Sequence, residues 1–252
     1  EKAGQVCGRQ LKQMGVNLAL VSALDILRDP RWGRSEECYS EDPYLSAKLA
    51  QAIITGIQNE GVAVVAKHFC AQGETTGGVN ASAARIGNRE LWEIHLQTAK
   101  ACCEAGVKGI MAAYNEIDGM FCHANRQLLQ NILREQFGFD GVVMADGIAI
   151  DQLDIMTGDN IRSAALALKA GVDISLWDEG YTKLEDALKL GFITEEELDR
   201  AVLRVLTLKF DLGLMDKPYI DENGNRTASY CEQGCVSFST KEYQESEILA
   251  RE

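Results

Sequence analysis

Five short apolar runs alternate with segments of helical periodicity, and this alternation constrains the fold of the chain more than any other feature. The runs span residues 16–21, 62–66, 107–113, 141–144 and 172–176, and a Gly-Val pair marks the start of each one. The amphipathic segments that precede them include residues 44–58, 89–104, 125–136 and 161–170. Strands and helices alternating at this spacing are typical of a parallel sheet covered by helices.

Glycines mark the predicted ends of these helices. Gly15, Gly61, Gly106 and Gly171 follow directly after helical segments, where a residue with positive φ commonly ends a helix. Further along the chain, residues 181–190 form another predicted helix, and Thr194 with Glu197 three positions later predicts a capped helix over 195–212.

An open doubly wound sheet and a closed barrel both bury strands that are apolar on both faces. None of the five strands is followed by a glycine-rich phosphate loop or a Walker lysine motif, which favours the barrel. A complete barrel has more strands than the five identified here. We therefore predict an α/β fold, a (β/α)8 TIM-like barrel that is incomplete because its early strands are missing.

The composition changes toward the C-terminus. Residues 216–230 are polar and rich in glycine and asparagine, which predicts a linker, and a helical pattern resumes over 242–252. We expect a barrel domain over residues 1–214, and a linker with the start of a second domain over 215–252. The chain begins inside a predicted helix without an initiator Met, so we expect a piece of a longer protein.

Charge and cysteine content restrict the partners. The 252 residues carry a net charge of −13, which argues against nucleic acid and anionic membranes but permits an uncharged ligand. No apolar run is long enough to span a bilayer. The eight cysteines resemble neither a disulfide framework nor a zinc site, so we expect reduced thiols in the cytoplasm, with secretion left open by the truncated start.

Polar side chains follow several of the predicted strands. Asp146 follows the run at 141–144, Lys67 and His68 follow the second run, and Tyr114 follows the third. Ligands bind at the carboxyl ends of parallel strands, so these residues are candidates for one site. Each also has a structural interpretation, since Asp-Gly is common turn chemistry and a lone histidine or tyrosine is often part of the core.

An arginine-rich loop follows the first strand, with Arg28, Asp29, Trp32 and Arg34 close together. Arginine offers a planar fork of donors for vicinal hydroxyls, and tryptophan offers an apolar plane, the two surfaces that a sugar needs. Internal Arg–Asp pairs are the simplest account of Arg28 and Asp29. Arg34 is the arginine that we expect at the ligand. Asp173, by contrast, is expected to be a structural hydrogen-bonding residue.

The chain resembles glycoside hydrolase family 3, the β-glucosidase family, over residues 1 to 214. The resemblance is carried by six blocks in order: LDILRDPRWGR (24–34), EDP (41–43), KHF (67–69), NREL (88–91), AYN (113–115) and GFDGVVMAD (138–146). It implies a retaining, exo-acting β-glycosidase that needs neither metal nor cofactor.

The resemblance also assigns roles to residues. Asp146 is implied as the nucleophile that forms a glycosyl-enzyme intermediate. Arg34, Lys67 and His68 are implied to bind hydroxyls of the sugar that is cleaved, with Tyr114 beside the nucleophile. The acid/base glutamate is implied to come from a following α/β-sandwich domain, a partner that this chain lacks.

Two positions depart from the family pattern. Gly147 stands where an aromatic residue, often tryptophan, follows the nucleophile, so one wall of the sugar pocket is expected to be missing. The loop after residues 67–69 has no histidine to act as acid/base, and Glu74 on that loop is expected to be solvated. We therefore expect the chain alone to have little activity.

Two other functions fit the pattern of strands. Lys67 at a strand end could form a Schiff base, as in barrel aldolases and lyases. A non-catalytic barrel that only binds sugar is the second alternative. The Schiff base would leave the arginine-rich loop and Asp146 without a clear role.

Overall fold

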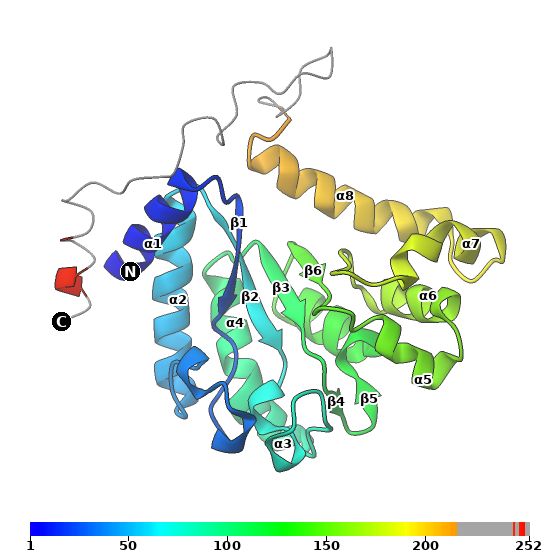
Figure 1. Cartoon of the computed structure of the whole chain (residues 1–252), viewed down its shortest axis with the longest axis horizontal. Helices are drawn as coiled ribbons and strands as arrows, with labels where there is room; N and C mark the ends of the chain where they lie inside the picture. Colours follow the sequence, from blue (N-terminus) through cyan, green and yellow to red (C-terminus); the bar gives the residue numbers. More distant parts are fainter. Residues whose placement is uncertain (216–243, 245–246, 250–252) are drawn as a thin grey trace.

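Four parallel strands form the central sheet of the computed structural model, which describes residues 1–215, 244 and 247–249 (Figure 1). They are β1 (Leu18–Ser22), β2 (Ala63–Phe69), β3 (Gly109–Ala112) and β6 (Val142–Met144), and they lie side by side in this order. Each new strand is added to the same edge, without the reversal that marks a doubly wound sheet. The parallel α/β fold is therefore confirmed, while the described strands do not close on themselves into a barrel.

The fifth predicted strand is reduced to a single bridge. Ile174 pairs in parallel with Met144, so the segment does lie beside β6. The Asp173 carboxylate, however, accepts a hydrogen bond from the Val143 N–H at 2.8 Å, and the N–H groups of Asp173 and Ile174 both bond to the Val143 carbonyl. A side chain thus occupies a position in the ladder that a backbone carbonyl would fill, and a regular strand does not form.

Helices connect and cover the strands. The α-helices are α1 (Lys2–Gln13), α2 (Pro43–Asn59), α3 (Asn88–Glu90), α4 (Leu96–Glu104), α5 (Asp154–Thr157), α6 (Asn160–Ala170), α7 (Leu184–Lys189) and α8 (Glu195–Asp211). Residues Leu91–His95 and Gln127–Gln136 are π-helical. A short hairpin, β4 (Glu116–Ile117) with β5 (Met120–Phe121), follows β3. The linker predicted over 216–230 and most of the helix predicted over 242–252 lie outside the described residues.

Short 3-10 turns fill the loops after the strands. They span Pro30–Trp32, Ser35–Glu37, Gln72–Glu74, Thr76–Gly78, Cys122–Ala124, Asp151–Leu153 and Gly180–Lys183. Several of them carry or adjoin the residues that the sequence analysis placed at the site.

Helix boundaries follow the capping residues in the sequence. Gly15, Gly61, Gly106 and Gly171 all have positive φ after a helix, as predicted. The Thr194 hydroxyl accepts from the Glu197 N–H and the Glu197 carboxylate accepts from the Thr194 N–H, which confirms the capping box at the start of α8. These local signals explain why the predicted helices are found within a few residues of their expected bounds.

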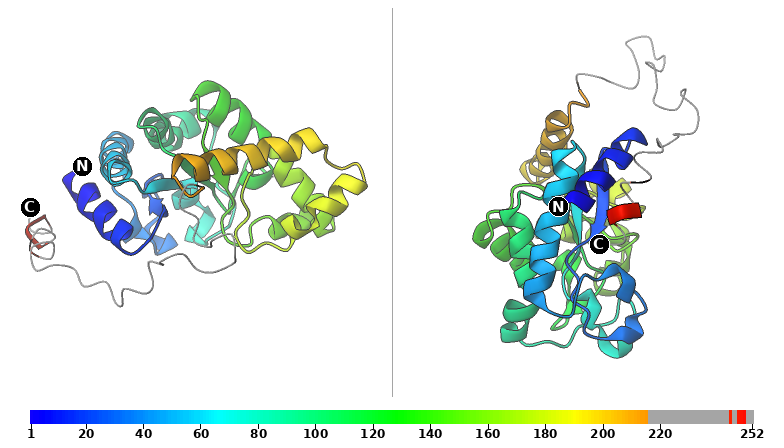
Figure 2. Two further views of the ribbon diagram at one scale, coloured as in Figure 1. Left: turned by 90° about the horizontal axis from the view of Figure 1, so that it is seen from above. Right: turned by 90° about the vertical axis from the view of Figure 1, so that its left-hand side faces the viewer.

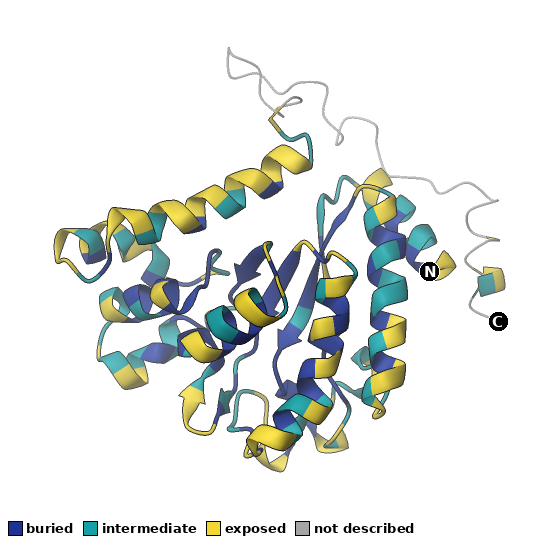
Figure 3. Cartoon of the chain, turned by 180° about the vertical axis from the view of Figure 1, so that it is seen from behind, coloured by how far each residue is buried: buried dark blue, intermediate teal, exposed yellow. Residues whose placement is uncertain are grey.

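The two faces of the sheet have different neighbours. Helices α1, α2 and α4 follow one another along one side, where Val64, Ile110 and Val143 lie in the main core (Figure 2). Buried strands lie inside a layer of helices whose outer faces are exposed (Figure 3). On the other face, Val65, Met111 and Met144 form a separate small cluster. Helix α8 crosses the end of the sheet at which the strands begin, so the opposite end is left to the loops (Figure 1).

Candidate active site

The loops at the carboxyl ends of the strands bring the charged candidates together. Arg34 follows β1, His68 lies at the end of β2, and Asp146 follows β6. The Arg34 Nη2 atom is 3.4 Å from His68 Nε2, and His68 Nε2 is 3.6 Å from Asp146 Oδ2. Residues separated by more than a hundred positions in the sequence thus form one cluster.

The imidazole of His68 is fixed by Asp25, to which sequence reasoning gave no role. Asp25 Oδ2 lies 2.6 Å from His68 Nδ1 and also accepts from the His68 backbone N–H at 3.1 Å. Both side chains are buried. A carboxylate at Nδ1 holds the proton there and turns Nε2 toward Arg34 and Asp146. The only signal for Asp25 in the sequence is its position in the block before the arginine-rich loop.

One carboxylate oxygen of Asp146 makes no hydrogen bond to the described residues. Oδ1 accepts from the Gly147 N–H at 2.8 Å, whereas Oδ2 is buried and has no hydrogen bond within the described chain. The residue as a whole is 9% exposed. A buried carboxylate oxygen without a donor is unusual, because leaving such a group unpaired costs free energy. Oδ2 is therefore the atom that is free to react or to bind a ligand.

Arg34 is held by a carboxylate. Its Nε and Nη2 bond to the two oxygens of Glu37 at 2.5 and 2.7 Å, and the Ser22 hydroxyl donates to Glu37 Oε2 at 2.7 Å. The pKa of Glu37 is lowered to about 2. The largest cause is the hydrogen bond from Arg34, followed by the hydrogen bond from Ser22 and the positive charges of Arg34 and Lys67. Nη1 of Arg34 has no hydrogen-bond partner among the described residues, which leaves a donor for a ligand.

Lys67 and His68 come to the same cluster although neighbours on a strand normally point apart. The register between β2 and β3 shifts between Ala66 and Phe69, so the regular strand is interrupted at these two residues. The Lys67 side chain makes no hydrogen bond or ion pair within the described chain, and its charge acts on Glu37. Irregularities of this kind re-aim side chains beside functional sites.

The tyrosine after β3 contacts the segment that carries the nucleophile candidate. The Tyr114 hydroxyl donates to the Gly147 carbonyl at 2.7 Å. Burial and, next, the negative charge of Asp146 raise the pKa of Tyr114 to about 12. Tyr114 thus stays protonated at neutral pH beside Asp146.

Internal Arg–Asp pairing in the arginine-rich loop is confirmed for Asp29, which pairs with Arg31 at 2.6 Å. It is wrong for Arg28, which bonds instead to Glu74 and Glu90. The Asp29 carboxylate also accepts a hydrogen bond from the Arg31 backbone N–H and so caps the turn that begins at Pro30. This places the Arg31 side chain close to Asp29.

Trp32 does not offer an open plane to a sugar. It is 6% exposed, its indole N–H donates to Asn80 at 2.9 Å, and the Arg34 guanidinium lies 4.9 Å from the ring centroid. The ring edge also meets His68. Trp32 therefore packs against Arg34 and His68. Burying its large apolar surface is more favourable than exposing it to water.

Glu74 is not solvated as expected. His95 and Arg28 contact its carboxylate at 3.2 and 2.8 Å, and these two residues lower its pKa. A general acid needs a carboxyl group that keeps its proton near neutral pH, so a lowered pKa is the wrong property. Glu74 is instead a structural ion-pair partner.

The backbone at Asp146 is held by a histidine that sequence reasoning missed. The Asp146 N–H donates to His123 Nε2 at 3.1 Å. Burial lowers the pKa of His123 to about 3, so the ring is neutral and its Nε2 can accept. The signal in the sequence is a lone histidine in the stretch 119–125, which the family resemblance also covers.

Replacing His123 with Gln is expected to reduce the loss of free energy of unfolding as the pH falls. Between pH 6.5 and about 3 the unfolded chain protonates this histidine and the folded chain does not, so stability falls as pH falls. The contribution is at most about 1.4 kcal/mol per pH unit. Urea unfolding of both proteins at pH 7, 5.5 and 4.5 measures how the free energy of unfolding changes with pH. The same change with pH in the two proteins would contradict a buried, neutral His123.

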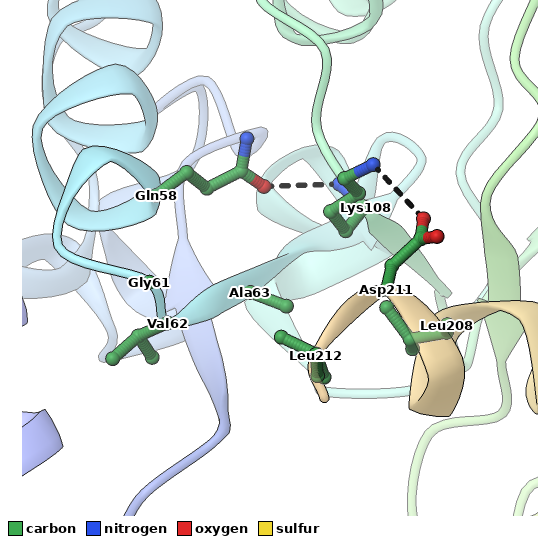
Figure 4. A pocket seen from close by; sticks show the side chains of 8 residues that line it. All are labelled: Gln58, Gly61, Val62, Ala63, Lys108, Leu208, Asp211 and Leu212. Atoms are coloured by element: carbon green, nitrogen blue, oxygen red, sulfur yellow. Dashed lines mark hydrogen bonds and ion pairs between the residues drawn. The ribbon is translucent and has the colours of Figure 1, made fainter. Parts of the chain in front are cut away.

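A cavity at the other end of the strands does not belong to this cluster. Its volume is about 360 Å³, and it is lined by Gly61, Val62, Ala63, Lys108, Leu208 and neighbouring residues (Figure 4). A Lys108–Asp211 ion pair of 3.5 Å crosses it. It lies where the strands begin, the end of an α/β barrel that serves stability rather than catalysis.

The described residues offer neither a metal site nor a membrane-spanning helix. No group of three or more His, Cys, Asp or Glu side chains there is arranged to hold a metal ion. None of the helices described is both long and apolar enough to cross a bilayer. The cytoplasmic location stays a prediction.

Comparison with known proteins identifies the family. The profile of the "Glycosyl hydrolase family 3 N terminal domain" matches residues 1–208. The chain belongs to glycosyl hydrolase family 3. A periplasmic β-glucosidase of Salmonella typhimurium is 34% identical over 226 residues, which are 86% of this chain and 29% of that protein. A β-xylosidase of Formosa agariphila is 33% identical over 237 residues, 86% of this chain and 33% of its own length.

Solved structures of β-glucosidases agree with this chain in fold. The β-glucosidase from Listeria innocua superposes with a TM-score of 0.88 at 30% identity, covering 97% of this chain and 35% of its own. That enzyme has also been solved in complex with glucose. The present family 3 chain thus spans about a third of the length of the relatives it matches.

Proposed function

We propose that the chain carries the nucleophile of a retaining, exo-acting β-glycosidase of the β-glucosidase type, which hydrolyses terminal β-D-glycosyl residues. The observation that carries the proposal is Asp146 Oδ2, a buried carboxylate oxygen that makes no hydrogen bond to the described residues and lies 3.6 Å from His68 Nε2. Membership of glycosyl hydrolase family 3 supports the reaction class. The glucose complex of the Listeria innocua enzyme supports a sugar as the ligand.

In the first step Asp146 Oδ2 bonds to the anomeric carbon, and the bond from that carbon to the glycosidic oxygen breaks. The departing oxygen takes a proton from a general acid. In the second step the same group removes a proton from water, the water oxygen bonds to the anomeric carbon, and the Asp146 carboxylate is released. Two inversions give net retention.

Side chains around Asp146 are proposed to bind the sugar. Arg34 and Lys67 offer donors to the hydroxyls of a pyranose, and His68 Nε2 offers an acceptor. Hydrogen bonds to these hydroxyls can strengthen as positive charge develops on the ring. Tyr114 supports the same segment through Gly147.

The general acid is proposed to lie outside the described residues. A retaining enzyme needs a second carboxyl group about 5–5.5 Å from the nucleophile. Asp25 is engaged by His68, and Glu74 has a lowered pKa. We assign the acid/base role to a glutamate of a following α/β-sandwich domain, and propose that further strands close the sheet into a barrel.

The isolated chain of residues 1–252 is therefore expected to show little or no turnover. The physical reason is that the departing oxygen would leave without protonation. Release of nitrophenol from an aryl β-D-glucoside measures it, with the complete protein as control. Turnover by the isolated chain near the rate of the complete protein would contradict the division of the site.

The proposed reaction is tested by the stereochemistry of the product. With the complete protein and an aryl β-D-glucoside, the first sugar seen by proton NMR is expected to be the β-anomer. The α-anomer as first product would exclude a glycosyl-Asp146 intermediate. Borohydride trapping of a keto substrate on Lys67 would instead favour the Schiff-base lyase, and sugar binding without turnover would favour a non-catalytic barrel.

A further inference from the structure

Trp177 is the most exposed aromatic side chain among the described residues, and it lies at the carboxyl end of the sheet. It is 81% exposed, whereas Trp32 at the same end of the sheet is buried. It follows the Ile174 bridge to β6, so it lies next to the segment that carries Asp146. A large apolar ring open to solvent at a site of polar donors is a typical binding element.

The absence of a side chain at Gly147 lets the indole of Trp177 pack close to the backbone there. A Cβ atom at Gly147 would lie 3.4 Å from Cε3 and 3.6 Å from Cζ3 of Trp177, and 3.3 Å from the Tyr114 hydroxyl. The indole therefore lies against the backbone of the residue that follows Asp146. Trp177 thus lies beside the position from which a side chain at residue 147 would project.

Trp177 and Ile148, on two neighbouring loops, are both held in a costly backbone conformation. Trp177 has φ +66° and Ile148 has φ +62°, which is rare for any side chain and especially for a β-branched one. The Ile148 N–H donates to the Leu176 carbonyl at 2.8 Å. The buried Asp178 carboxylate accepts from Ile150 at 2.7 Å and from Leu176 at 3.0 Å. Strained residues that the surroundings hold in place cluster at functional sites.

The order of the strands indicates which part of a substrate would meet the ring. Arg34 and His68 follow β1 and β2, on one side of Asp146, and Trp177 follows the segment beyond β6, on the other. If Arg34 and His68 bind the pyranose and its anomeric carbon lies at Asp146, the departing group of the substrate points toward Trp177. We propose, resting on the function above, that Trp177 is the stacking platform for the aglycone and selects glycosides with a flat, apolar one.

The test is binding of three unreactive or slowly reacting ligands to the complete protein by calorimetry. These are glucose, methyl 1-thio-β-D-glucoside and phenyl 1-thio-β-D-glucoside. Trp177→Ala is expected to weaken the phenyl ligand about two- to tenfold, the range for one aromatic contact, and to leave the other two unchanged. Trp177→Phe should retain most of the preference, and Tyr44→Ala, at an aromatic residue that is 71% exposed on α2, should change nothing.

Each result has one consequence. An unchanged ratio of phenyl to methyl affinity in Trp177→Ala overturns the platform while leaving the glycosidase proposal intact. An equal loss for all three ligands also overturns it, since the ring would then serve the glycone or the fold. A wild-type protein that binds none of the ligands overturns the glycosidase proposal itself, and this inference with it.

Discussion

Asp146→Asn in the complete protein is expected to lower the turnover number on an aryl β-D-glucoside by several orders of magnitude, on the order of 10⁴ or more. The amide oxygen is a poor nucleophile and carries no charge to stabilise the developing positive charge at the anomeric carbon. The Asp146 N–H that bonds to His123 is unaffected, so the fold is expected to survive. Steady-state kinetics with thermal unfolding of both proteins measures the effect.

The matched control is Asp140→Asn, which changes an exposed carboxylate six positions earlier on the same segment. It is expected to leave turnover unchanged. A binding module would show no turnover to lose in either variant. Loss of activity in both variants, or in neither, would contradict the role of Asp146.

The largest effect on stability is expected at Asp173. Its carboxylate bonds to Arg134 at 2.7 Å, to Arg204 at 2.8 Å and to the Val143 N–H at 2.8 Å. Burial raises the pKa of Asp173, and the two arginines oppose that shift. Asp173→Ala leaves the buried Arg134 guanidinium without its counterion, which costs about 3–5 kcal/mol.

Urea unfolding of the chain measures this change in the free energy of unfolding. Glu185→Gln is the control, because it removes the exposed Glu185–Lys189 pair, and an exposed pair is worth only about 0–1 kcal/mol. Similar small losses for the two variants would show that the Asp173 cluster is not a buried ion-pair network.

Local signals in the sequence predict much of this fold. Apolar runs, Gly171 with its positive φ and the Thr194–Glu197 capping box act within a few residues, so they can be found without knowing the tertiary structure. Strand ends predict where His68 and Asp146 meet, because parallel strands place their carboxyl ends at one edge.

Contacts between distant segments could not be predicted. The pairing of Asp25 with His68, of His123 with the Asp146 backbone, and of Trp177 with Gly147 each depends on how loops pack. The same holds for Arg28, which bonds to Glu74 from a neighbouring loop rather than to the nearby Asp29. Sequence proximity favours the local pair, but the folded loops decide the partner.

The central claim is that Asp146 Oδ2 forms a covalent bond to the sugar. Incubation of the complete protein with a 2-deoxy-2-fluoro-β-D-glucosyl fluoride, followed by proteolysis and mass spectrometry, tests it most directly. We predict one label for each protein molecule, on the peptide that contains Asp146, and none in Asp146→Asn. A label on another carboxylate, or full labelling of the Asn variant, would contradict the account.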